Sequence, residues 1–497
     1  MSAGPDVVVI GSGMGGATLA AALAASGRRI VILERGERLA DGPEARDAEA
    51  IFGRGHFRPK EEWLTPAGEA FNPGNYYYVG GNTKLYGAVL IRYRAEDFRP
   101  IRHLGGTTPG WPIAYEDLEP WYQRAEEMYR VRGDAGQDPT EPRHSGVYPF
   151  PPVPDEPAIA DLRARLTRAG VTPSALPLGL DLDGWLRRAA TPWDAFPDTT
   201  GAKSDAESVG IAAALAHPNV TLETGALVTR LTAGPDGRIA AVEYRQGGEA
   251  KRLEPGLVAL SAGAVNSAAL LLRSGLANRS DQVGRNFMNH NCSAVLAVSP
   301  FRRNGSVYQK TLYVNDFYLS GGKDGTPLGN IQLLGKISGP ILAAAGGVPR
   351  AVAGWLAGHA VDLYAMSEDL PDPESRVTLL GTGAGERIVL DWRRSNWEAH
   401  EALVARLKAV LRRAGFPVAL SKPFDRRTPS HQCGTARMGR DPGASVLDVF
   451  CRAHDHANLF VVDASFLPTS AAVNPALTIA AQALRTADHM LSKDLAG

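Results

Sequence analysis

The sequence predicts an α/β fold, α+β overall, in which a parallel nucleotide-binding sheet is joined to a second, antiparallel sheet. Three observations predict it: a strand, glycine turn and helix at the start of the chain, a second such unit at 253–275, and alternating polar and apolar residues within 293–430. Strands followed by helices are typical of parallel sheets, and alternation is typical of antiparallel strands with one solvated face.

A short glycine-rich stretch opens the chain. Val7 to Ile10 form an apolar run typical of a buried parallel strand, and a G-x-G-x-x-G pattern follows it directly. The three glycines of the pattern are Gly11, Gly13 and Gly16. The first permits a tight turn, the second lets the backbone approach a pyrophosphate, and the third lets the next helix, expected at 17–26, pack closely on the strand. We therefore predict a Rossmann-like dinucleotide-binding unit.

The second expected strand ends at Glu34, about twenty residues after these glycines. A carboxylate at this place can accept a hydrogen bond from a ribose hydroxyl. The pattern by itself fits NAD as well as FAD, so both dinucleotides stay open at this point.

Length and charge limit the class of protein. A chain of 497 residues exceeds the size at which one hydrophobic core keeps growing, so we expect two domains. Lys plus Arg and Asp plus Glu number 53 each, which argues against nucleic acid as a partner. Cys292, Cys433 and Cys451 lie far apart without a C-x-x-C pattern, so neither a disulfide framework nor a metal site is predicted.

The sequence favours a cytoplasmic protein without a membrane partner. Residues 1–5 are too few to hold the charged and apolar regions of an export signal. The apolar runs of 341–366 fall short of the ~20 residues that span a bilayer, because Arg350 and His359 interrupt them. We expect this stretch to form a pair of helices that packs on the protein or at a subunit contact.

The nucleotide-binding pattern is interrupted and then resumed. Residues 36–75 are rich in glycine, proline and charge, and the Gly-Gly-Asn-Thr stretch at 80–83 can then present backbone N–H groups to a phosphate or a ring edge. An amphipathic helix with core aromatic residues is expected at 112–129. The later expected elements are a helix at 208–216, strands at 220–224, 227–231, 238–244 and 253–260, and a helix that ends before Gly275.

Residues 293–430 differ from both flanking regions. Strands with one wet face are expected at 306–318 and 330–335, and an amphipathic helix at 397–414. A sheet of this kind can roof a ligand cavity.

The candidate chemistry lies in the last part of the chain, which contains His431. Val461 and Val462 read as a buried strand that ends at Asp463. Pro475 is expected at the first position of a long C-terminal helix, which makes Asn474 its N-cap. The start of that helix carries a partial positive charge suited to an anion.

With these motifs the chain resembles the glucose–methanol–choline (GMC) flavoprotein oxidoreductases, from its first strand to its last helix. Four motifs agree in order: the opening glycine pattern with Glu34, the Gly-Gly stretch at 80–83, the 263–276 segment and the terminal His–Asn region. The Pro-Glu-Ser-Arg-Val-Thr-Leu stretch at 373–379 also looks like a strand of that family's substrate domain.

The resemblance implies FAD and oxidation of an alcohol CH–OH by hydride transfer to flavin N5. The implied substrate is a small-molecule alcohol or sugar, and the implied electron acceptor is O2 or another compound. Positions that match cofactor contacts come from all four motifs and from one strand near the adenine. They are Gly11, Gly13, Met14, Gly16, Glu34, Arg35, Gly80, Gly81, Asn82, Thr83, Val228, Gly263, Asp463, Ala464, Asn474, Pro475 and Leu477.

His431 matches the active-site histidine of the family, and Asn474 matches a second position that is either histidine or asparagine there. An imidazole titrates near the operating pH, so His431 is the expected general base for the hydroxyl proton. Asn474 can orient the substrate oxygen while it stays neutral. The N-terminus of the following helix can stabilise negative charge on reduced flavin.

Two departures from the family pattern follow the Gly-Gly loop. Some members attach FAD covalently through a histidine just after the loop; this chain has Leu85 there, so non-covalent FAD is expected. The next position, often asparagine in the family, is Tyr86, which leaves oxidase and dehydrogenase both open.

Polar residues of the expected roof favour a sugar, glycoside or polyol as substrate, although a solvated strand face would give the same pattern. They are Tyr308, Gln309, Lys310, Asn315, Asp316, Tyr318 and Gln332. A lipophilic or aromatic alcohol stays open, as do a non-redox flavoprotein lyase on the same fold, an NAD-binding protein without a redox role, and the oligomeric state.

The expected domains are both discontinuous. The FAD-binding domain is expected to comprise residues 1–40, 72–94, 200–292 and 441–497. The substrate-binding domain, an antiparallel sheet flanked by helices, is expected to comprise 41–71, 95–199 and 293–440.

Overall fold

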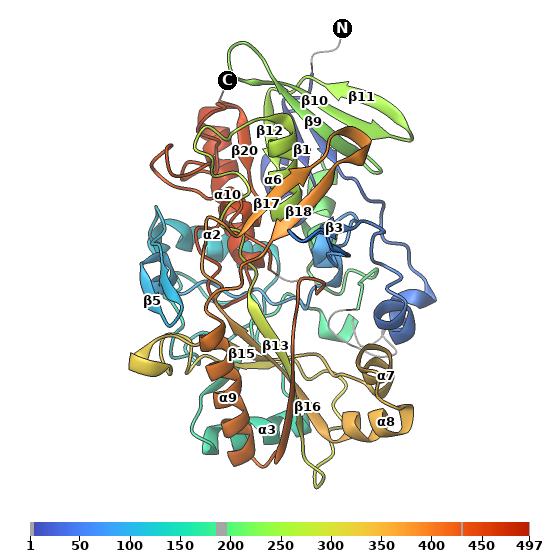
Figure 1. The fold of residues 1–497 in the computed structure, drawn as a ribbon, viewed down its shortest axis with the longest axis vertical. Helices are drawn as coiled ribbons and strands as arrows, with labels where there is room; N and C mark the ends of the chain where they lie inside the picture. The colour runs from blue at the N-terminus through green and yellow to red at the C-terminus, as the bar shows by residue number, and fades with distance from the viewer. Residues whose placement is uncertain (1–3, 185–195, 429–430, 497) are drawn as a thin grey trace.

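A computed structural model describes residues 4–184, 196–428 and 431–496 of the chain (Figure 1). Residues 1–3, the start of the 1–5 stretch considered above, lie outside this description. A parallel sheet lies at the end of the molecule that carries both termini, and an antiparallel sheet lies at the opposite end. This arrangement confirms the predicted fold class.

Five parallel strands form the first sheet, in the order β20-β12-β1-β2-β8. Their bounds are β1 Val7–Ile10, β2 Ile30–Leu33, β8 Val220–Glu223, β12 Leu257–Leu260 and β20 Leu459–Val461. All residues of β1, β2, β12 and β20 are buried, as apolar runs in a parallel sheet are. Val9 pairs with Ile32 on one side and with Ala259 on the other, so the opening strand is central.

Helices and a small antiparallel sheet cover the parallel sheet. Helix α1 (Met14–Ala24) packs against α10 (Ala476–Lys493), and α2 (Tyr115–Met128) packs on α10 in turn. Helix α6 (Ala264–Ser274) packs against β9, which belongs to the small sheet. The strands of that sheet are β9 Leu227–Ala233, β10 Ile239–Gln246 and β11 Glu249–Leu253.

The C-terminal helix begins one residue later than predicted. Its N-cap is Pro475, whose backbone already lies in the right-handed helical region, and the predicted N-cap Asn474 is wrong. The side chain of Asn474 does not cap the helix because it is hydrogen-bonded to two other side chains, those of Gln332 and His431.

The second large sheet has six strands in the order β19-β13-β16-β15-β14-β7. Their bounds are β7 Pro173–Ala175, β13 Asn291–Val298, β14 Leu312–Val314, β15 Asn330–Leu333, β16 Ala360–Ser367 and β19 Val418–Pro423. Helices α3 (Pro157–Arg168) and α9 (Trp397–Arg413) cover one face. Ile331 and Leu333 join that core, whereas Gln332 points to the other face because successive side chains of a strand alternate.

Two expectations for this region are corrected. Within 306–318 only Leu312–Val314 forms a strand, and β15 is buried along its whole length instead of having a wet face. The 341–366 stretch does begin as a helix pair, α7 (Gly339–Gly346) and α8 (Arg350–Gly358), but it ends in the buried strand β16. Residues 360–367 form a strand because they pair with β13 and β15, and the local pattern of apolar residues does not show this pairing.

The remaining elements are short. The expected helix at 208–216 is a π-helical turn at Ala206–Ile211 followed by α5 (Ala212–Leu215). A four-stranded sheet and a hairpin complete the fold: β17 Arg376–Leu380, β18 Arg387–Asp391, β3 Trp63–Leu64, β4 Ala70–Phe71, and β5 Ile101–His103 with β6 Gly106–Thr108. Across the described ranges, no helix has both the length and the apolarity needed to cross a membrane.

Candidate active site

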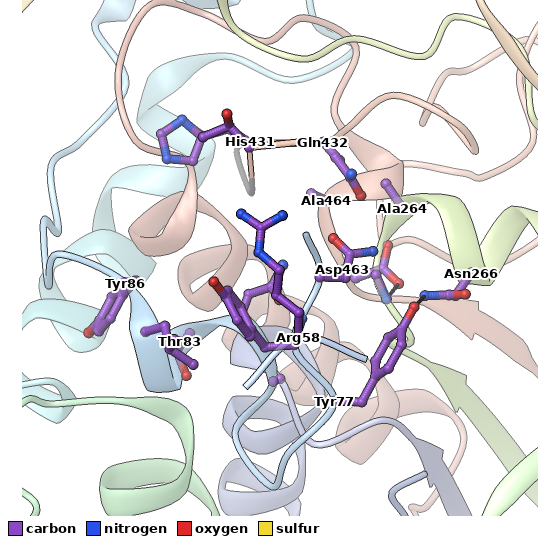
Figure 2. A pocket seen from close by; sticks show the side chains of 18 of the residues that line it. Arg58, Tyr77, Thr83, Tyr86, Ala264, Asn266, His431, Gln432, Asp463 and Ala464 are labelled. Atoms are coloured by element: carbon purple, nitrogen blue, oxygen red, sulfur yellow. Dashed lines mark hydrogen bonds between the residues drawn. The ribbon is translucent and has the colours of Figure 1, made fainter. Parts of the chain in front are cut away.

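A cavity of about 1820 Å³ runs from the carboxyl ends of the parallel strands to the inner face of the six-stranded sheet. Figure 2 shows side chains that line it, among them Arg58, Thr83 and His431. The structure brings most predicted site residues together on its walls. They are Gly11, Gly13, Met14, Glu34, Arg35, Gly81, Asn82, Thr83, Val228, Gly263, His431, Asp463, Ala464, Asn474 and Pro475.

The opening glycines form a backbone cradle. Gly11 has a φ of +97°, and a Cβ on it would lie 2.3 Å from the Ser261 carbonyl oxygen. A Cβ on Gly16 would lie 2.1 Å from the Gly11 carbonyl oxygen, so this glycine serves helix packing. A Cβ on Gly13 would meet no atom within 4 Å, because its backbone faces the cavity. This open, glycine-lined turn at the start of α1 fits a pyrophosphate.

The two glycine motifs meet in space. Gly80 N–H donates to Ser12 Oγ at 3.0 Å, and a Cβ on Gly81 would lie 3.3 Å from Gly13 Cα. Gly80 and Gly81 both have positive φ, 92° and 57°, which leads the chain into the short helix η3 (Gly81–Leu85). Two loops distant in sequence thus form one wall of the cavity.

Glu34 already has protein partners. Its carboxylate accepts from Ser12 N–H at 3.0 Å, from Ser12 Oγ at 2.7 Å and from Gly36 N–H at 2.9 Å. Burial raises the pKa of Glu34, and these hydrogen bonds oppose the rise. The expected contact with a ribose hydroxyl stays a prediction, and Glu34 also holds the glycine turn in shape.

Asp463 ties the last strand to the second glycine turn. Its Oδ2 accepts from Gly263 N–H at 3.0 Å and from the Ser267 hydroxyl, and its Oδ1 accepts from Ser465 N–H at 2.8 Å. Burial raises the pKa of Asp463, and the same hydrogen bonds oppose that rise. The C-terminal segment is therefore fixed against the start of α6.

Three predicted cofactor residues do not line the cavity. Gly16 and Gly80 lie behind the walls and shape the turns. Leu477 is fully buried in the hydrophobic core, because its place in the first turn of α10 turns its side chain inward. This geometry argues against a direct contact of the Leu477 side chain with a ligand in the cavity.

His431 and Asn474 lie next to each other on the cavity wall. Asn474 Nδ2 lies 3.3 Å from His431 Nε2. Burial lowers the pKa of His431 well below its usual value, with smaller contributions from His290 and Lys310. His431 is thus neutral at neutral pH, which leaves one ring nitrogen able to accept a proton.

A second histidine lies behind His431 and was not anticipated from the sequence. His290 is 2% exposed, and its Nδ1 lies 2.8 Å from His431 Nδ1. The signal in the sequence is the polar triplet at 289–291, which leads into β13, and it does not indicate a partner. Sequence reasoning also missed many other residues of the cavity wall, among them Arg58, Tyr77, Asn266 and Gln432.

The polar roof is smaller than expected. Only Lys310 and Gln332 of its seven predicted residues line the cavity. The other five are hydrogen-bonded within the protein. Three of them donate from their side chains to carboxylates: Gln309 to Asp362, Asn315 to Asp138 and Tyr318 to Asp97. Asp316 accepts from Thr172 N–H, and Tyr308 N–H donates to Glu156. The irregular path of the chain through 306–311 breaks the alternation on which the prediction rested.

The two residues after the Gly-Gly loop lie at the wall. Leu85 and Tyr86 both line the cavity. The Tyr86 hydroxyl donates to the Ser204 carbonyl at 2.6 Å, so its polar end is bound by the protein, and burial raises its pKa well above the usual value.

Comparison with known proteins agrees with this geometry. Family models of the N-terminal and C-terminal parts of GMC oxidoreductases match residues 188–292 and 371–483, and an NAD(P)-binding Rossmann-like domain matches residues 9–50. The chain is 32% identical to a 6'''-hydroxyparomomycin C oxidase of Streptomyces lividus over 98% of this chain and 91% of the relative. It is 29% identical to a paromamine 6'-oxidase of Streptomyces fradiae, over 97% and 90% of the two chains.

A solved structure, a pyridoxine 4-oxidase described as from Mesorbium loti, has the same fold. It superposes with a TM-score of 0.69 and 19% identity over 98% of this chain and 99% of that chain. The chain belongs to the GMC oxidoreductase family, and it is an enzyme of that family. Family membership and the dinucleotide-binding fold imply a flavin cofactor, which the open backbone at Gly13 and the size of the cavity fit.

Proposed function

We propose that this enzyme oxidises a CH–OH group of a sugar, glycoside or polyol, with His431 as the general base. The observation that carries the proposal is the His431–Asn474 pair on the wall of a cavity that begins at the nucleotide-binding turn. Relatives are named for a hydroxyparomomycin, for 2-methyl-1,2-propanediol and for fructose, all of which bear hydroxyl groups.

We infer that the cofactor is FAD, held without a covalent bond. The residues that would hold it are the cavity-lining members of the predicted set, with the pyrophosphate at Gly11–Gly13 and the ribose near Glu34. Leu85 offers only aliphatic carbon where some family members attach the flavin. When bound, FAD supplies the acceptor for the substrate hydride.

The chain's own residues handle the proton. His431 Nε2, kept neutral by burial, takes the hydroxyl proton, and Asn474 Nδ2 donates a hydrogen bond to the substrate oxygen as negative charge grows on it. Both groups lie on the same wall, so one oxygen can contact both. The positive end of α10 adds a favourable field at the same place.

The division of labour follows the two sheets. We propose that residues 1–40, 72–94, 200–292 and 441–497 bind FAD, and that 41–71, 95–199 and 293–440 shape the substrate side. Support comes from the two sheets. The first set contains all five strands of the parallel sheet. The second set contains the six-stranded sheet, except for the first two residues of β13.

The test is anaerobic bleaching of the flavin by a panel of sugars, glycosides, polyols and lipophilic alcohols. A sugar or polyol is expected to bleach the parent, and His431→Ala is expected to slow the reaction at least about 100-fold. His454→Ala, a histidine away from the cavity, is the matched control and keeps the parent rate.

Equal bleaching of His431→Ala and the parent would show that the base is another group. Carbonyl formation with no change in flavin absorbance would instead indicate a lyase. The same panel, run in air with peroxide detection and again with dye acceptors, separates oxidase from dehydrogenase.

A further inference from the structure

The second buried histidine is held beside His431 by the backbone. Met288 N–H donates to the Cys433 carbonyl at 3.0 Å, and Cys433 N–H donates back to the Met288 carbonyl at 2.9 Å. This bridge sets the register of the two segments, so His290 and His431, each two residues from it, face each other. Their rings are nearly perpendicular, at 78°.

The protonation of His290 follows from its partners. His290 Nε2 lies 2.8 Å from the Ser470 carbonyl oxygen and 2.8 Å from the Ala471 carbonyl oxygen. Carbonyl oxygens only accept, so Nε2 carries the hydrogen. Burial lowers the pKa of His290, against smaller opposite effects of the two carbonyls and of Glu368. The ring is therefore neutral, and its Nδ1 is an acceptor.

The protonation of His431 follows in turn. Its Nδ1 lies 2.8 Å from the Nδ1 of His290, which can only accept. His431 must then carry its hydrogen on Nδ1, which leaves the lone pair on Nε2. That lone pair faces Asn474 Nδ2 at 3.3 Å, on the cavity side.

We propose that His290 is a positioning residue that fixes His431 in the tautomer with its basic nitrogen, Nε2, toward the substrate. This inference rests on the proposed role of His431. In the reaction the substrate O–H bond breaks and its proton bonds to His431 Nε2, while the electron pair left on oxygen completes the C=O bond of the product as the C–H bond breaks. Bound FAD would accept that hydride.

The charged groups around the pair act in opposite directions. Glu368, which accepts from Ala471 N–H at 3.1 Å, favours positive charge on His290. Lys310, on the cavity wall, disfavours positive charge on His431. His290 Nε2–H faces the carbonyl oxygens of Ser470 and Ala471, which accept a hydrogen bond but do not take up a proton, so the described partners of His290 give it no role as a proton relay.

The experiment compares two variants of the FAD-loaded enzyme. His290→Phe keeps an aromatic ring and removes the acceptor, whereas His290→Asn keeps an acceptor oxygen. The rate of flavin reduction per bound FAD is measured for each, together with ¹⁵N chemical shifts of labelled histidines, which report the tautomer of His431. His431→Ala is measured beside them.

The expected result has three parts. In the parent, His431 shows the Nδ1–H tautomer and His290 the Nε2–H tautomer. His290→Phe loses the fixed tautomer of His431 and slows flavin reduction about 100-fold. His290→Asn keeps the tautomer and stays within about tenfold of the parent.

Two results would overturn the proposal. One is the opposite tautomer of either histidine in the parent, a measurement that needs no variant and holds even where His290→Phe does not fold. The other is parental reduction by His290→Phe while His431→Ala is slow. If instead His431→Ala itself is as fast as the parent, the role of His431 as base fails, and the tautomers still test the histidine pair separately.

Discussion

Gln332 Nε2 donates a hydrogen bond to Asn474 Oδ1 at 2.6 Å. Gln332 lies on β15 of the antiparallel sheet, and Asn474 lies just before α10 on the nucleotide-binding side. The contact fixes the direction of the Asn474 amide, because its oxygen is engaged and its Nδ2 is left to face His431 at 3.3 Å. The two sheets are thus joined at the place where the substrate oxygen is expected.

Replacing Gln332 with leucine is expected to lower kcat about tenfold. The Asn474 amide loses the partner that orients it, and a hydrogen bond at the upper end of the usual range, about 1.4 kcal/mol, corresponds to about a factor of ten in rate. Steady-state kinetics with the best substrate of the panel measures the change. Gln246→Leu, on β10 away from the cavity, is the control and keeps the parent kcat. An unchanged kcat in Gln332→Leu would contradict the orienting role.

Gly13→Leu is expected to give folded but colourless protein. A Cβ at Gly13 meets no protein atom within 4 Å, and its φ is not positive, so the side chain enters only the space assigned to the pyrophosphate. Gly354→Leu on α8, which also meets nothing within 4 Å, is the matched control and stays yellow. Flavin absorbance and circular dichroism of the purified proteins decide the outcome. A yellow Gly13→Leu protein would contradict the placement of the pyrophosphate at this turn.

Asp97→Asn is expected to change how stability depends on pH. Asp97 accepts from Arg94 N–H at 2.7 Å and from the Tyr318 hydroxyl at 2.8 Å, and burial, aided by Glu368, raises its pKa to about 7. Between about pH 4 and pH 7 the folded state binds a proton that the unfolded state does not, so this carboxyl lowers stability by ~1.4 kcal/mol per pH unit as pH rises.

The variant lacks this dependence. Relative to the parent, the free energy of unfolding of Asp97→Asn should therefore increase between about pH 5 and about pH 7, by roughly 1–3 kcal/mol. Urea unfolding at the two pH values measures it. A constant difference between variant and parent would mean that Asp97 is ionised in the folded protein throughout this range.

Lys84→Met is expected to destabilise the protein by about 3–5 kcal/mol. Lys84 is 3% exposed, and its Nζ lies 3.0 Å from Asp205 Oδ2 and 2.9 Å from Glu207 Oε2. Removing the ammonium leaves the buried Asp205 carboxylate without this ionic partner, next to Glu207, which is half-buried and keeps its ion pair with Arg38. Denaturant unfolding checks the value. Lys60→Met, at an exposed position, is the control and should change the free energy of unfolding little. An equal effect of both variants would contradict the explanation.

Local signals in the sequence predicted the nucleotide-binding half well. Apolar runs, glycine spacing and the residue at the end of β2 are all determined within about 30 residues, as a strand–turn–helix–strand unit is. The resemblance of four such motifs to one family then predicted the membership that the comparisons confirm.

Features that depend on distant partners were not predictable in the same way. The 360–367 stretch is apolar in either a helix or a strand, and only its neighbours β13 and β15 make it a strand. His290 gains its position from the bridge between Met288 and Cys433, and no spacing in the sequence announces it. The prediction of Asn474 as the N-cap of the last helix was wrong by one residue, because the Asn474 side chain is bound by the distant Gln332 and by His431 and does not cap the helix.

The place of β20 at the edge of the parallel sheet bears on how the protein is made. Translation delivers β1, β2, β8 and β12 long before β20, which pairs with β12, and Asp463, which closes the turn at Gly263. A growing chain therefore carries an unpaired strand edge and an incomplete ligand cradle until its last segment emerges. Premature termination before β20 should yield a chain that cannot retain its cofactor and that quality-control proteases remove.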